Sequence, residues 1–140
     1  MSRGVIRASI VAGGLLGAVS VAAGAFGAHG LRAVLEASGQ AGNWETASRY
    51  ALVHALALVA TGLVAALPGG AANRMVAAAA WCFGSGTLIF SGCLWILAVT
   101  GIRTLGAVVP IGGGLLVAAW LLLAIGGGRL GPNSPPRTGH

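Results

Sequence analysis

The sequence predicts an all-α membrane protein: a four-helix antiparallel transmembrane bundle with a short interfacial helix after the first span. Of its 140 residues, 56% are hydrophobic and only 7% are charged, whereas about a quarter of the residues of a soluble domain are charged. The apolar residues form four blocks, each long enough to cross a hydrocarbon core of about 30 Å as a helix. So few charged side chains cannot cover a surface that faces water, so lipid is the expected solvent.

The first predicted span is Ala8–Ala28, an uncharged run that measures about 31 Å as a helix. Small residues recur along it every three or four positions, and this spacing lets a second helix backbone approach closely. These residues are Gly13, Gly17, Ser20, Gly24 and Gly27. The alternative is a cleaved signal peptide, with small residues at Ala23 and Ala25 as the cleavage site. The apolar run is longer than a usual signal sequence, which favours a retained span.

A short amphipathic helix is predicted for Leu31–Ser38. Its apolar residues follow the spacing of one helix face, and Arg32 and Glu36 form an i,i+4 pair on the other face. The segment is too short to span, so we expect it to lie in the membrane interface and to end at Gly39.

The second predicted span runs from an N-cap at Asn43 to Leu67, with Glu45 in its first turn. The third runs from Arg74 to Thr100, capped by Asn73 and closed by Gly101. Trp81 and Trp95 lie near its two ends and are expected in the interfacial belts. Ser85 and Gly92 share one face of the helix and are expected to permit close packing.

The fourth predicted span is Leu105–Gly126, capped by Thr104. Pro110 falls inside it and crowds the carbonyl of Gly106, and three glycines follow at 112–114. We therefore expect a kinked or locally unwound helix near the middle of this span. Residues 1–126 form a single transmembrane domain in this interpretation, and residues 127–140 form a disordered tail rich in Gly, Pro and Arg.

The arginines predict the orientation in the membrane. With four spans, five arginines fall on the side of the termini and three fall on the other side with both acidic residues. The first group is Arg3, Arg7, Arg74, Arg129 and Arg137, and the second is Arg32, Arg49 and Arg103. The positive-inside rule then places both termini in the cytoplasm of a multi-pass protein of the bacterial plasma (inner) membrane.

A candidate polar cluster lies where ionisable residues enter the second span. Glu45 and Arg49 are i,i+4 partners, and Tyr50 and His54 lie four apart on an adjacent face. His29 ends the first span on the same side of the membrane. Ionisable groups inside a membrane are often functional, and this mouth could relay protons or bind a headgroup. The simpler interpretation, which we favour, is that each group satisfies a helix end or a neighbouring carbonyl.

Several function classes lack supporting residues. The net charge of +6 comes from dispersed arginines rather than a basic stripe, which argues against nucleic-acid binding and for contact with anionic headgroups. The two acids and the scattered histidines match no metal or catalytic motif, so we expect no metal, no cofactor and no enzymatic activity. Cys82 and Cys93 would stand about 16 Å apart along one helix, too far for a disulfide.

Several ordered motifs resemble one known family. They are GAFGAHGL at 24–31, ETASRYALVHALAL at 45–58, FGSGTLIFSGCLWILAVTG at 83–101 and VPIGG at 109–113, followed by Trp120. This pattern resembles the small membrane proteins that include YgdD and transmembrane protein 256, also called domain of unknown function 423. Trp95 and Val109 depart from it, since the family usually has Tyr and Thr there. The resemblance implies a four-span bundle in a bacterial or mitochondrial inner membrane, and no established reaction. Its motif positions are His29, Glu45, Tyr50, His54, Ser91, Gly92 and Pro110.

The leading functional prediction is a non-enzymatic integral membrane protein with a structural, accessory or assembly role. Its expected partners are the lipid bilayer and, through the small-residue faces, other membrane proteins or a second copy. The alternative is a small carrier, or a protein that handles protons or lipids at the His29/Glu45/Arg49/His54 mouth and the break at Pro110.

Overall fold

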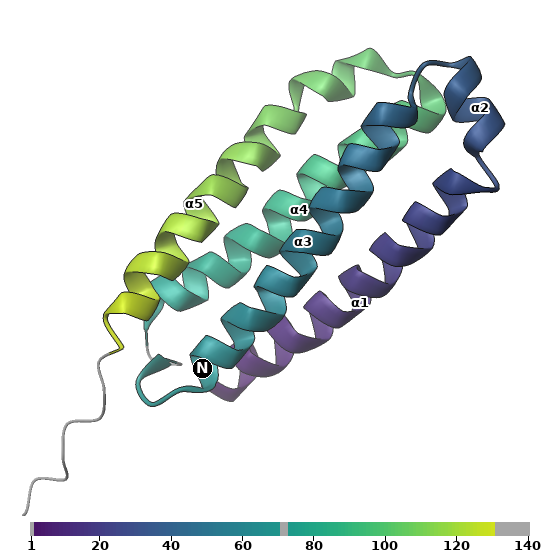
Figure 1. The fold of residues 1–140 in the computed structure, drawn as a ribbon. Coiled ribbons are helices and arrows are strands. Elements are labelled where there is room, and N and C mark those ends of the chain that lie inside the picture. The colour runs from purple at the N-terminus through teal and green to yellow at the C-terminus, as the bar shows by residue number, and fades with distance from the viewer. Residues whose placement is uncertain (1, 71–72, 131–140) are drawn as a thin grey trace, which may run out of the picture.

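The computed structural model describes residues 2–70 and 73–130 and is all-helical over them. Four long helices run antiparallel to their sequence neighbours (Figure 1). They are α1 (Ser2–Ala28), α3 (Ala41–Ala66), α4 (Arg74–Thr100) and α5 (Val109–Gly128); the short α2 (Arg32–Ala37) joins α1 to α3, and the 3₁₀-helix η2 (Arg103–Ala107) precedes α5. Four segments are long and apolar enough to cross a membrane. The predicted class, an all-α membrane bundle, is confirmed.

The four helices pack as an open row, not as a closed ring. α1 packs along α3, α3 along α4 and α4 along α5, while α1 and α5 are the two outer helices (Figure 1). α3 meets α5 in only a few places. Consequently the two middle helices bury far more of their surface than the outer two, whose remaining faces are apolar and exposed.

The apolar core lies between α3, α4 and α5. Phe83 of α4 is fully buried at its centre. Small side chains surround it and let the backbones of α3 and α5 approach α4, with one leucine each from α3 and α5. The cluster consists of Ala57, Leu58, Ala79, Phe83, Leu116 and Ala119.

Small residues bring α1 against α3, as the stripe on the first span predicts. A Cβ added at Gly13 would lie 2.8 Å from the carbonyl oxygen of Ala55, so only glycine fits there. Ser20 is buried, and Gly27 lies directly against the ring of Trp44. Gly24 is the exception, because a Cβ there would meet nothing within 4 Å. One position of the stripe therefore faces open space.

The short helix after the first span is confirmed, its place in the membrane interface stays a prediction, and the start predicted for the next span is wrong. α2 carries the Arg32–Glu36 pair at 2.9 Å, and Gly39 ends it with a φ of +68°. This left-handed turn redirects the chain at once, so α3 begins at Ala41, with Gln40 at the N-cap position. Asn43 lies inside the first turn and donates to the side chain of Gln40 at 2.7 Å. Glu45 is consequently outside the first turn.

The third span has the predicted bounds. The Asn73 side chain accepts a hydrogen bond from Met75 N at 3.0 Å, and Gly101 closes α4 with a φ of +71°. Trp95 turns into the bundle and donates to Ser48 Oγ at 3.1 Å, whereas Trp81 is 77% exposed. The places of both residues in interfacial belts stay predictions.

The close-packing face of α4 was also predicted incorrectly. Ser85 is exposed, and a Cβ at Gly92 would meet nothing within 4 Å. The close approach to α5 instead uses Gly86 and Gly112, where a Cβ at Gly112 would lie 2.6 Å from Phe90 N. The spacing of small residues along one helix shows which of its faces carry small side chains, but it does not show which of these faces packs against another helix.

The predicted mid-span kink is wrong as well. The chain breaks between η2 and α5, and Pro110 lies in the first turn of α5. An N–H in a first turn has no intrahelical acceptor, so proline costs little there. Gly106 and Thr104 belong to η2, which has no side-chain cap, and the glycines at 112–114 are regular helix. The break therefore shortens the fourth helix without bending it.

The helix order places Arg7, Arg74 and Arg129 at the end of the bundle opposite α2. At this end Asn73 Nδ2 donates to the carbonyl of Gly126 at 2.8 Å and Arg129 contacts Met75 Sδ at 3.4 Å. Gly127 and Gly128 belong to α5, and most of the predicted disordered tail, residues 131–140, lies outside the described residues.

Candidate functional site

The structure divides the predicted polar cluster into three places. Glu45 and Arg49 form an exposed, loose pair on α3 at 4.0 Å. Tyr50 and His54 lie on the side of α3 that faces α5. His29 follows the last residue of α1, is exposed, and lines neither of the two grooves described below. The five residues therefore do not form one mouth.

His54 is the buried member, with 6% of its surface exposed. Its Nδ1 lies 2.7 Å from the carbonyl oxygen of Tyr50, which can only accept, so Nδ1 must carry a proton. Nε2 is then the acceptor for the indole N–H of Trp120 at 3.3 Å. These partners assign the neutral Nδ1–H tautomer.

Aromatic rings enclose this histidine. Tyr50 stacks on Phe90 with ring centroids 4.7 Å apart, and Phe83 meets Trp120 edge-on at 5.1 Å. The His54 ring lies 5.9 Å from Phe83 and 6.2 Å from Trp120. Since α3 and α5 touch in few other places, the His54–Trp120 hydrogen bond is a main link between them.

A groove of about 620 Å³ runs beside this link between α3 and α5. Its walls are mostly apolar, with the rings of Tyr50, His54 and Trp120 along it and Arg49 among its lining residues. Because both His54 nitrogens are already bonded, this groove offers a ligand mainly apolar and aromatic surface.

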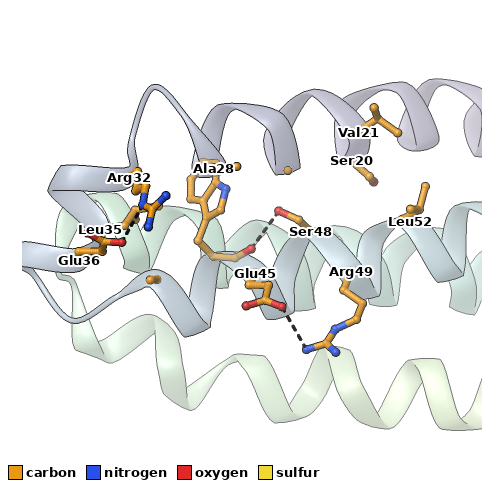
Figure 2. A pocket seen from close by; sticks show the side chains of 14 residues that line it. Ser20, Val21, Ala28, Arg32, Leu35, Glu36, Glu45, Ser48, Arg49 and Leu52 are labelled. Carbon is orange, nitrogen blue, oxygen red and sulfur yellow. Dashed lines mark hydrogen bonds and ion pairs between the residues drawn. The ribbon is translucent and has the colours of Figure 1, made fainter.

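A second groove of about 690 Å³ lies between α1, α2 and α3, and we call it the interfacial groove. Figure 2 shows the Arg32–Glu36 pair of α2 near one end of it and the Glu45–Arg49 pair on α3. Glu36 and Glu45 are the two acidic residues of the whole sequence. Both therefore lie on a single groove, each beside an arginine.

Three tryptophans form hydrogen bonds between helices that the sequence did not predict. Trp44 donates to the Ala23 carbonyl at 2.8 Å, Trp95 to Ser48 at 3.1 Å, and Trp120 to His54 at 3.3 Å. Each bond crosses from one helix to another. No spacing within one helix reveals such a pair, although an indole N–H in an apolar span always needs an acceptor.

Ser91 of α4 differs from four other buried hydroxyls. Ser20, Ser48, Thr61 and Thr87 each donate to the carbonyl four residues back. Among the residues described, Ser91 Oγ is buried without a hydrogen-bond partner.

The fold and the site together define an integral membrane protein whose few polar groups gather at helix contacts and at one groove. The chain belongs to the family described as Protein of unknown function (DUF423), whose model matches residues 23–113. This is the family that the sequence motifs indicated.

Relatives named UPF0382 membrane proteins match this chain over nearly their whole length. A UPF0382 membrane protein of Staphylococcus saprophyticus is 40% identical over 121 residues, covering 86% of this chain and 97% of the relative. One from Staphylococcus haemolyticus is 43% identical over 116 residues, covering 83% and 91%. YwdK of Bacillus subtilis is 33% identical over 120 residues, covering 86% and 95%. No solved structure matches significantly.

Proposed function

We propose that the protein is a non-enzymatic accessory or assembly component of the bacterial plasma (inner) membrane, with both termini in the cytoplasm. The observation that carries this proposal is the state of His54. Both ring nitrogens are engaged within the fold, Nδ1 with the Tyr50 carbonyl of its own helix and Nε2 with the Trp120 indole of α5. Its geometry suits a bridge between helices.

The open row supports an accessory role. α1 and α5 each pack on one side only, which leaves long apolar faces on both edges of the protein. In lipid such faces can pack against another transmembrane helix wherever small residues allow close approach. Gly14 on α1 and Gly114 on α5 are exposed positions of this kind.

The carrier alternative receives less support from the geometry. His29 lies apart from His54, and the Glu45–Arg49 pair is exposed. Pro110 lies in the first turn of α5.

We expect His54→Ala to weaken the fold, because it leaves the Trp120 indole without its acceptor in an apolar setting. Trp120→Phe removes the same hydrogen bond, so the two effects should be less than additive, with a coupling of about 1 kcal/mol. Reversible unfolding of the purified protein in mixed micelles measures both. His29→Ala is the control and should change nothing.

Co-purification in several mild detergents tests the accessory role directly. We expect a defined complex that contains this protein, and less of it when His54 is replaced. Recovery of monomer alone in every detergent would contradict the role. Loss of proton flux in liposomes from a His54→Ala protein of unchanged stability would favour the carrier instead.

A further inference from the structure

The interfacial groove has a charge pattern found nowhere else on this chain. It is lined by two carboxylates, Glu36 and Glu45, and two guanidinium groups, Arg32 and Arg49. The remaining six charged residues of the sequence are all arginines. The groove is therefore neutral overall and presents both signs of charge, while the rest of the molecule presents cations alone.

The charged groups have hydrogen-bonding capacity to spare. The closest atoms of Arg49 and Glu45 are 4.0 Å apart, too far for a hydrogen bond. The Arg32–Glu36 pair uses one nitrogen and one oxygen at 2.9 Å and is exposed. A guanidinium has five N–H donors and a carboxylate has several acceptor sites. Both pairs can bind a ligand without first breaking a buried contact.

Polarity changes along the groove. Figure 2 shows the α2 pair toward one end, the Glu45–Arg49 pair further along, and Ser20, Val21 and Leu52 toward the other end. The wall between the ends is made of small residues such as Gly24 and Ala28. A ligand that fits has a charged end of both signs and a flexible apolar end.

The depth of these residues suits the membrane interface. α3 has 26 residues and measures about 39 Å, so a few ångströms at each end exceed a hydrocarbon core of about 30 Å. Glu45 lies about 6 Å from the start of α3 and Arg49 about 12 Å, within reach of the headgroups by snorkelling. Val21 and Leu52 then lie at the depth of acyl chains.

We propose that the interfacial groove binds one phospholipid with a zwitterionic, amine-bearing headgroup, of the phosphoethanolamine type. The phosphate binds Arg49 and the ammonium binds Glu45, the Arg32–Glu36 pair lines the groove beyond the headgroup, and one acyl chain follows the apolar wall past Gly24. The proposal is independent of the accessory role, since a bound lipid can accompany any function of the bundle.

Charge distinguishes this ligand from an anionic lipid. An anionic headgroup would gain from the two arginines but would be repelled by two nearby carboxylates. The dispersed arginines elsewhere already offer anionic lipids sites without such repulsion. The two carboxylates are therefore the feature that selects the amine-bearing headgroup.

Gly24 permits a test that leaves the helix contacts intact. A Cβ there meets nothing within 4 Å, yet the residue lines the groove, so the side chain of Gly24→Phe leaves the backbone toward open space and occupies part of the groove. Gly14→Phe is the matched control: it is on the same helix, has equally open space and lies outside the groove. Equal unfolding midpoints of the two variants establish that both are folded.

The experiment is native mass spectrometry of the full chain released from nanodiscs that contain equal amounts of phosphatidylethanolamine and phosphatidylglycerol. We expect the original protein and Gly14→Phe to retain one phosphatidylethanolamine, severalfold over phosphatidylglycerol, and Gly24→Phe to lose this adduct. Combined Glu36→Gln and Glu45→Gln should abolish the preference while leaving the total lipid retained similar.

Three results would overturn the proposal. The first is equal retention of both lipids by the original protein. The second is an undiminished phosphatidylethanolamine adduct on folded Gly24→Phe or on the double Gln variant. The third is a dimer that Gly24→Phe separates without changing the lipid retained, which would assign the groove to a second copy. If Gly24→Phe does not fold, the double Gln variant alone decides.

Discussion

Single residues in this protein satisfy their polar groups within lipid by pairing them across helices. In hydrocarbon no water is available, so an indole N–H or an imidazole nitrogen needs a protein partner. Neutral His54 supplies one donor to its own helix and one acceptor to α5. Trp44 and Trp95 make comparable links from α3 to α1 and from α4 to α3.

Neighbouring glycines of α1 should differ sharply in tolerance. Gly13→Leu would press on the carbonyl of Ala55 and the side chain of Val59, and backbone cannot move as a rotamer can. We expect a loss of about 1–3 kcal/mol in unfolding free energy. Gly14→Leu points into open space and should cost almost nothing. Unfolding in mixed micelles compares them, and equal effects would contradict the α1–α3 packing.

At the scale of elements, turns decide where helices begin. Gly39 and Gly101 adopt positive φ and end α2 and α4, and the chain then starts a new helical segment within three residues. η2 separates the α4 terminus from α5, so Pro110 enters the first turn of a fresh helix. The position of a proline within its helix, not its presence, sets its energetic effect.

Pro110→Ala distinguishes a first-turn proline from a mid-helix kink by the sign of its effect. In a first turn proline restricts the unfolded chain, so alanine should reduce stability by roughly 0.4–1 kcal/mol. Within a helix interior the same replacement would raise stability by about 3 kcal/mol. The measurement is the unfolding free energy in mixed micelles. A marked gain would show that the fourth span is continuous and kinked.

At the scale of the whole molecule, the open row gives the protein two ends of different charge. Arg7, Arg74 and Arg129 lie at one end, and α2, η2 and the interfacial groove lie at the other. The positive-inside rule supports the proposal that the first end is cytoplasmic, and the groove would then open to the outer leaflet.

Labelling of single cysteines tests this orientation. In a background with Cys82→Ala and Cys93→Ala, we expect Ser38→Cys to react with a membrane-impermeant maleimide on intact cells. Arg129→Cys should react only after the cells are opened. The reverse pattern would place both termini outside the cytoplasm and the groove on the inner leaflet.

The sequence alone predicted most of the one-helix features. Asn73 and Gly101 bound the third span correctly, and the Arg32–Glu36 pair and the stop at Gly39 follow from local spacing. The predicted roles of Asn43 as an N-cap and of Pro110 as a mid-span kink were wrong. A residue that can start a helix and a residue that can break one each fit several positions along a long apolar run. The spacing predicted that the small residues of the first span form one packing face, but it did not predict that Gly24 on this face lies next to open space.

What the sequence by itself determined is the class of protein, since composition leaves lipid as the only suitable solvent and the length of each apolar block then marks a helix that can span it. Only the tertiary structure decided that His54 meets Trp120, that His29 stays apart, and that both acids line one groove. The physical reason is that all faces of these helices are apolar, so hydrophobicity does not distinguish inward from outward. Close backbone contacts at small residues such as Gly13 and Gly112 make that choice.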